Sequence, residues 1–200
     1  LIYLGSIGTW YMLDEMLAFF VQRLKHAPCA RLLFVTQESE APIRAKAEAL
    51  GIARERILVT SAKRADVPLY LSLARFGLFF IRPSFSKLAS SPTKQGEIMA
   101  MGLPLICNSG IGDTDRIVNL YNSGLLVKSF NDEAYAKAAR AMDEKHFSAS
   151  AIVAGAHDYF GLDAGVDTLL PLVEGERDGD GGQDADEDDA AEALDQGEAL

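Results

Sequence analysis

The feature that most constrains this chain is an alternation of short apolar runs with longer segments of helical pattern, continuing to about residue 145. The runs are brief and almost continuously hydrophobic, which is typical of strands that helices cover on both faces. The predicted strands span residues 2–4, 31–35, 57–60, 77–81, 104–107 and 124–127. This alternation predicts a doubly wound α/β fold with a mostly parallel, Rossmann-like sheet.

The intervening segments predict helices that glycines and prolines terminate, as Gly51 does for the second helix. These helices span residues 12–26, 42–50, 67–75, 93–101, 114–121 and 132–145, with two closing helices at 150–159 and 163–172. We therefore expect one Rossmann-like domain over residues 1–173. Gly, Asp, Glu and Ala dominate residues 174–200, which predicts a disordered acidic tail because no core can form there.

The net charge of −10 comes from the tail and not from the predicted domain. Residues 174–200 hold 12 of the 29 acidic residues and one of the 19 basic residues. Residues 1–173 therefore hold 17 acidic and 18 basic residues. A balanced domain with an acidic end has no basic footprint for a phosphate backbone. We therefore expect no nucleic-acid partner.

Two cysteines, Cys29 and Cys107, are too few and too far apart in sequence to indicate a disulfide scaffold or a zinc site. No apolar stretch reaches the length of a membrane span, and the chain does not begin with a secretory signal pattern. These features favour a reduced, cytoplasmic protein without a tightly bound metal. Because the first residue is Leu1 and residues 2–4 already form a strand pattern, we expect a piece of a longer chain.

The segment of residues 90–115 carries the clearest binding signal. Ser91 followed by Pro92 predicts an N-cap and a first helical position, whose free N–H groups and helix dipole favour a phosphate. Lys94 and Glu97 are three residues apart, so a helix places them on one face. The pair offers a cation for phosphate and a carboxylate that accepts hydroxyl hydrogen bonds.

Two glycine turns follow predicted strands. In the first, Gly5 and Ser6 open a turn whose N–H groups either approach a pyrophosphate or serve only the tight turn. This turn lacks the third glycine of the dinucleotide fingerprint, and no acidic residue follows directly after the second strand, which disfavours a nicotinamide enzyme. In the second, Gly110 and Gly112 either open space for a ligand or shape a turn that Asp113 caps.

Loops at the carboxyl edge of the predicted sheet are rich in bases. Each one alone is typical of a solvated surface charge, whereas together they favour an anionic ligand. These bases are Lys63, Arg64, Arg82, Lys87 and Lys94.

Residues 83–115 resemble the donor-binding half of GT-B fold glycosyltransferases of group 1, family 4. That family shows a Pro-Ser and then Glu-Ala-Met-Ala-x-Gly-x-Pro-x-Ile, and this chain has Pro83-Ser84 and the sequence EIMAMGLPLI from Glu97. The resemblance covers most of residues 1–173. It implies a retaining transferase that moves a sugar from a nucleotide-diphosphate sugar to an acceptor, without a tightly bound metal.

By position, Glu97 matches the second glutamate of the family's paired motif, which accepts hydrogen bonds from the nucleotide ribose. The first glutamate falls where this chain has Ala89, and the basic pair after the glycine turn falls within residues 9–12, which contain no base. We therefore expect Lys94 to supply the missing charge, with Lys94 and Glu97 as the catalytic pair. The expected donor-binding residues are Gly5, Ser6, Lys63, Arg64, Arg82, Ser90, Ser91, Thr93, Gly110 and Gly112.

The resemblance also implies that the acceptor site lies on a missing N-terminal domain, so this chain alone is expected to bind donor and turn over little. Any peripheral membrane contact is expected only through that domain. A second hypothesis is a non-catalytic nucleotide-binding or partner-docking module, motivated by Ala89 and the absent basic pair. A third is a nucleotide-sugar epimerase or a phosphorylase on the same fold.

Overall fold

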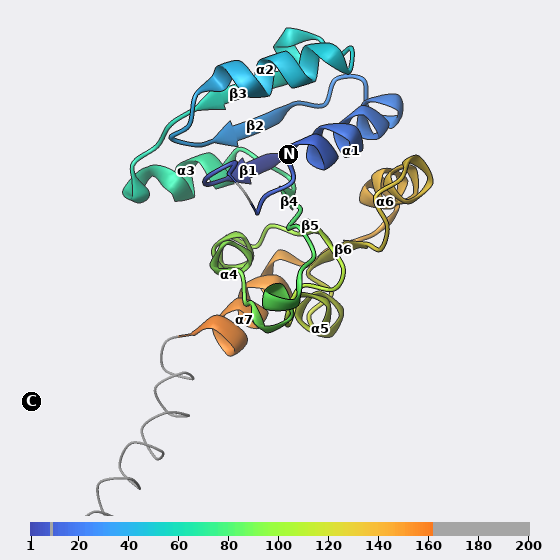
Figure 1. Cartoon of the computed structure of the whole chain (residues 1–200). Coiled ribbons are helices and arrows are strands. Elements are labelled where there is room, and N and C mark those ends of the chain that lie inside the picture. The colour runs from blue at the N-terminus through green and yellow to red at the C-terminus, as the bar shows by residue number, and fades with distance from the viewer. Residues whose placement is uncertain (9, 162–200) are drawn as a thin grey trace, which may run out of the picture. The chain divides into compact units, whose positions relative to one another are not determined.

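The structure, a computed structural model, describes residues 1–8 and 10–161, and within them six parallel strands form one sheet (Figure 1). The strand order is β3-β2-β1-β4-β5-β6, which reverses direction between β1 and β4. The strands are β1 (Ile2–Leu4), β2 (Leu32–Val35), β3 (Ile57–Thr60), β4 (Gly77–Phe79), β5 (Leu105–Asn108) and β6 (Gly124–Val127). The predicted doubly wound α/β fold is confirmed.

Helices connect the strands and close the described part of the chain. They are α1 (Leu13–His26), α2 (Glu40–Ala49), α3 (Val67–Ser72), α4 (Thr93–Ala100), α5 (Thr114–Leu120), α6 (Asp132–Glu144) and α7 (Ala149–Phe160). Short 3₁₀ helices are η1 (Arg54–Arg56), η2 (Arg64–Asp66) and η3 (Phe85–Ala89). Residues Leu1–Gly161 form one compact unit, whereas the expected helix at 163–172 and the expected tail at 174–200 lie outside the described residues.

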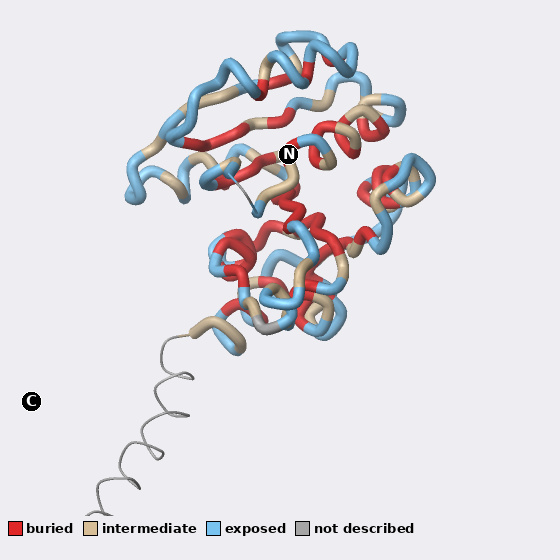
Figure 2. The backbone as a smooth tube through the Cα atoms, viewed as in Figure 1, coloured by how far each residue is buried: buried red, intermediate tan, exposed pale blue. Residues whose placement is uncertain are grey.

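Helices cover both faces of the sheet, with α1 and α6 on one side and α4 and α7 on the other (Figure 1). As Figure 2 shows, the central strands are buried, and β1, β4 and β5 are buried at every residue. Phe80, just after β4, stacks on Tyr135 of α6 and meets Phe19 of α1 edge-on. These buried aromatic contacts fix α1 and α6 to the sheet.

The carboxyl end of β4 differs from the prediction, because the strand ends at Phe79 and not at Ile81. Beyond Phe79 the side chain of Asn108, the last residue of β5, takes the place of backbone pairing between the two strands. Its amide oxygen accepts from the Ile81 N–H at 2.8 Å, and its amide nitrogen donates to the Ile81 carbonyl at 3.0 Å. Ile81 also forms an antiparallel bridge with Tyr11. The loops after β1 and β4 are therefore held together.

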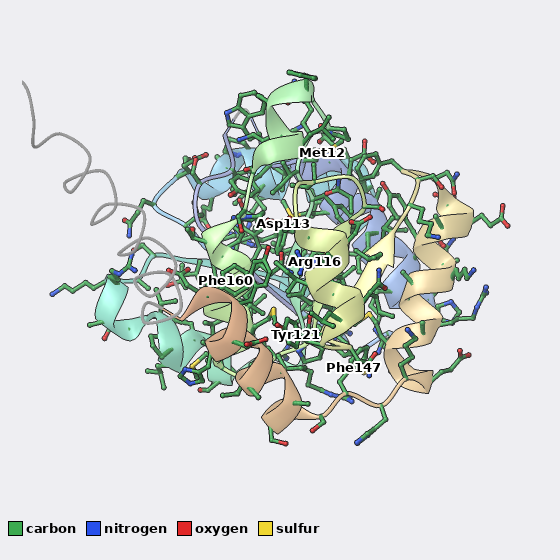
Figure 3. The ribbon with its side chains drawn as sticks, turned by 90° about the horizontal axis from the view of Figure 1, so that it is seen from below. Met12, Asp113, Arg116, Tyr121, Phe147 and Phe160 are labelled. Atoms are coloured by element: carbon green, nitrogen blue, oxygen red, sulfur yellow. The ribbon has the colours of Figure 1, made fainter. Side chains whose placement is uncertain are left out.

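The closing helix α7 packs on α4 and on the end of α5. Its Phe160 occupies the space beside Gly96 of α4, where an added Cβ would lie 2.8 Å from the ring. Tyr121, at the end of α5, packs against Gly155 of α7 in the same way, and its hydroxyl donates to Asp158 (Figure 3). None of the described helices has the length and apolar composition needed to cross a bilayer.

Candidate functional site

A cavity of about 870 Å³ opens at the carboxyl edge of the sheet, beside the point where the strand order reverses. Ligands of doubly wound folds bind at this place, because loops and helix starts converge there. Its walls come from the ends of β1 and β2, the loop after β3, α3 and the length of α4. Its apolar lining includes Val35, Val67, Pro68, Leu71, Ala100 and Met101.

Lys94 lies under one wall of this cavity and is only 7% exposed. Its ammonium donates to the Leu4 carbonyl at 2.6 Å and to the Tyr3 hydroxyl at 3.2 Å. It also lies 4.2 Å from the centre of the Tyr3 ring and 3.4 Å from that of Tyr11, so two aromatic faces stabilise the cation. We call Lys94, Tyr3 and Tyr11 the lysine cage.

Burial changes the protonation of this lysine. Loss of solvation lowers the pKa of Lys94 to about 7, and the nearby Glu97 carboxylate opposes that shift. Burial also raises the pKa of Tyr3 and of Tyr11, so both hydroxyls stay protonated near neutral pH. A phosphate arriving beside the cage would favour the charged ammonium, because an opposite charge favours the ionised form.

Glu97 lies one turn after Lys94 and borders the same cavity, as the sequence predicted. Its side chain is 43% exposed, and one carboxylate oxygen lies 3.6 Å from the guanidinium of Arg64. Arg64 is 94% exposed, so this ion pair is weak and leaves the carboxylate free to accept hydroxyl hydrogen bonds. The Lys94 ammonium is thus buried, whereas the Glu97 carboxylate is exposed to solvent.

The first glycine turn forms the part of the wall beside Lys94. Gly5 has φ +103° and its N–H donates to the Val35 carbonyl at 2.9 Å, which joins the ends of β1 and β2. The Ser6 hydroxyl and the Ile7 N–H both donate to one carboxylate oxygen of Glu38. Sequence reasoning missed Glu38, which lies three residues after β2. The signal that could have found it is an acidic residue at the carboxyl end of the strand beside β1.

The start of α4 differs from the prediction. The helix begins at Thr93, so Pro92 takes the N-cap position and Ser91 lies outside the helix. Pro92 has ψ 113°, an extended value, and no side chain caps the helix; the Pro92 carbonyl instead accepts from the N–H of Gln95 at 2.9 Å. Thr93 borders the cavity, whereas Ser91 is exposed and is not among its lining residues.

The second glycine turn lies away from the cavity lining and packs against the chain before α4. At Gly112, which has φ +42°, an added Cβ would lie 1.8 Å from the Ser90 carbonyl oxygen. Asp113 occupies the N-cap position of α5, as one of the two interpretations expected, but its side chain makes no capping hydrogen bond. Asp115 instead accepts from the Gly110 N–H at 3.2 Å. Local packing accounts for this turn.

The predicted cluster of bases separates into several places. Arg64 and Lys94 border the main cavity, and Arg82 borders a neighbouring one of about 410 Å³. Lys87 lies 4.5 Å above the Trp10 ring, and Lys63 is exposed without lining either cavity. Among the described residues, no three His, Cys, Asp or Glu side chains are arranged to hold a metal ion.

The cavity therefore joins an apolar wall to a short row of polar groups. The apolar side suits a flat ring system, and Glu97 suits sugar hydroxyls. Ser6, Thr93 and the lysine cage supply donors and positive charge for phosphate. Such a sequence of groups matches a nucleotide carrying phosphates.

Comparison with known proteins identifies the family of this chain. Residues 1–144 match the family model described as "Glycosyl transferases group 1". No curated protein matches the chain.

Solved structures share the fold. WaaG, a glycosyltransferase involved in lipopolysaccharide biosynthesis, is 21% identical with a TM-score of 0.58, over 90% of this chain and 47% of that chain. The pneumococcal O-GlcNAc transferase GtfA, solved with UDP and GlcNAc, is 15% identical with a TM-score of 0.66, over 87% and 35%. A Listeria monocytogenes protein described as a UDP-N-acetylglucosamine 2-epimerase is 15% identical with a TM-score of 0.54, over 88% of this chain and 44% of that chain. This chain spans less than half the length of each.

Proposed function

Because the chain belongs to the group 1 glycosyl transferases, with the fold of the C-terminal half of GT-B enzymes, we propose that it is the donor-binding half of a retaining glycosyltransferase. Its substrate in this proposal is a nucleotide-diphosphate sugar, from which the whole enzyme moves the sugar to an acceptor. In this proposal the site that binds the acceptor, and the groups that activate the acceptor, belong to a further N-terminal domain.

One observation carries the proposal: Lys94, Glu97 and the first glycine turn border a single cavity at the switch point of the sheet. Phosphate donors and a hydroxyl acceptor thus lie within reach of one ligand. The pneumococcal structure contains UDP bound to a protein of this fold, which supports the same class of ligand.

Each group has a role in donor binding and in bond cleavage. Glu97 accepts hydrogen bonds from the pentose hydroxyls, a charged contact of about 1.5–3 kcal/mol. The leaving diphosphate gains negative charge as the sugar departs with oxocarbenium character. Lys94, together with the N–H groups of Ser6 and Thr93, stabilises that charge in a site partly shielded from water. Lys94 already donates to Leu4 and Tyr3 and lies 3.4 Å from the Tyr11 ring, so in this proposal it acts on the diphosphate through its charge.

Calorimetric titration of the full chain with UDP-, GDP- and ADP-sugars tests the proposal. We expect one nucleotide to release heat and Glu97→Ala to remove most of that heat. Glu48→Ala, at an exposed position of α2, is the matched control and should bind like the unsubstituted chain. Silence with every nucleotide, or unchanged binding by Glu97→Ala, would contradict it.

A non-catalytic nucleotide-binding module is the second candidate, because Ala89 stands where the family has its first glutamate. Both candidates require donor binding, so binding does not separate them. Supplying the complete protein with donor and acceptor does: sugar transfer excludes the module, and binding without transfer favours it.

A further inference from the structure

An internal carboxylate already occupies the donors of the first glycine turn. One oxygen of Glu38 accepts from the Ile7 N–H at 2.9 Å and from the Ser6 hydroxyl at 2.5 Å. The Ser6 oxygen in turn accepts from the Gly8 N–H at 3.2 Å. A carboxylate oxygen and a phosphate oxygen take the same kinds of donor, so this arrangement resembles a filled anion site.

The neighbouring strand delivers this carboxylate to the turn. β2 pairs in parallel with β1, so the loop after β2 emerges beside the turn after β1. The Glu38 N–H donates to the Thr36 hydroxyl at 3.2 Å, a local hydrogen bond within this loop. Glu38 is exposed and borders both the main cavity and its smaller neighbour. Its side chain therefore has solvent to move into.

The charge of Glu38 also reaches the lysine cage. The pKa of Tyr3 is raised mainly by burial, then by Tyr11 and by Glu38. A diphosphate in the cavity would meet both this negative charge and turn donors that are already bonded. The two anions would thus compete for the same place.

We propose that the Glu38 carboxylate holds the Ser6 and Ile7 donors in the free protein and that the diphosphate of a donor nucleotide displaces it. Glu38 then sets the affinity for diphosphates and leaves recognition of the nucleoside to other groups. This inference rests on the proposed function. The opposite role is a brace that orders the turn for the ligand, and the two roles predict opposite effects of removing the charge.

Titration of the full chain with UDP, and separately with uridine, tests the competition. Glu38→Gln keeps the side chain's size and its hydrogen bonds but replaces the charged acceptor with a weaker neutral one. We expect Glu38→Gln to bind UDP about tenfold more tightly and uridine unchanged. Glu40→Gln, whose carboxylate pairs with Arg44 on α2, is the matched control and should leave both affinities unchanged.

The outcomes separate this inference from the proposed function. UDP binding that needs Glu97 but is equal or weaker in Glu38→Gln overturns the competition and leaves the donor site standing. Tighter binding by Glu38→Gln, with a UDP-induced shift of the Ile7 amide resonance, supports it. No UDP binding by either the unsubstituted chain or Glu38→Gln overturns both.

Discussion

The two glycine turns at the carboxyl edge of the sheet look alike in sequence and differ in what surrounds them. The first, after β1, borders the main cavity, and a Cβ added at Gly5 would lie 3.4 Å from the Lys94 ammonium. The second, after β5, is closed by the Ser90 backbone at Gly112. Tertiary neighbours, and not the glycines, decide which turn can serve a ligand.

The turns also differ in where their internal carboxylate comes from. Asp115, on the second turn, belongs to the helix that follows directly, and its bonds to Ser109 and Gly110 are local. Glu38, on the first turn, comes from the loop of the next strand. Local bonds of the first kind shape a turn, whereas an exposed carboxylate from a distant segment can be exchanged for a ligand.

The largest expected effect breaks the second turn. Gly112→Ala would place its methyl group 1.8 Å from the Ser90 carbonyl oxygen, at a residue that also has a positive φ. We therefore expect a loss of at least about 4 kcal/mol in unfolding free energy, or failure to fold. Gly110→Ala is the control, because its Cβ would meet nothing within 4 Å; only backbone strain of about 1 kcal/mol remains. Urea denaturation measures both. Equal losses would show that packing does not distinguish the two positions.

The next effect concerns the cage beneath the first turn. The folded-state pKa of Lys94 is lowered to about 7, so between pH 7 and 9 the unfolded chain binds more protons and stability rises with pH. Relative to Lys94→Met, the unsubstituted chain should gain about 2 kcal/mol across that range, with a slope that rises to about 1.4 kcal/mol per pH unit above about pH 8. Denaturant melts at several pH values measure the difference. Parallel pH profiles would mean that Lys94 is not desolvated.

A smaller stability effect is expected at the first turn itself. Gly5→Ala adds strain at φ +103° without a severe clash, which costs on the order of 1–2 kcal/mol. We expect its nucleotide affinity to fall more than tenfold, because the turn donors move. Thermal unfolding and calorimetry on one preparation compare the two losses. Unchanged nucleotide binding would remove this turn from the site.

The smallest effect is expected at the exposed end of the cavity. Arg64→Ala removes a 3.6 Å ion pair with Glu97 on the surface, so stability should change by less than about 0.5 kcal/mol. Donor affinity should fall only a few-fold. A drop of several degrees in melting temperature would show that Arg64 packs more firmly than its exposure indicates.

The fold was largely predictable from the sequence, because a parallel sheet covered on both faces leaves continuous apolar runs. Three strands match the prediction at both ends, for example Ile57–Thr60. The errors lie at element ends, where single contacts decide. Neither the Asn108 amide that takes over from β4 at Ile81 nor the extended backbone of Pro92 leaves a periodic signal.

The site was predictable where one helix carries it and less so where separate segments meet. The spacing of Lys94 and Glu97 placed both on one cavity. It did not reveal that Lys94 lies near the rings of both Tyr3 and Tyr11, because that cage joins β1, the loop after it and α4. Glu38 was missed for the same reason, since its role depends on which strand lies beside β1.

A crystal structure of the full chain with a bound nucleotide diphosphate tests the central claim most directly. The account predicts pentose hydroxyls within hydrogen-bond distance of the Glu97 carboxylate and phosphate oxygens between Lys94 and the first glycine turn. A nucleotide bound elsewhere, or bound in this cavity with its phosphates pointing away from Lys94, would contradict it.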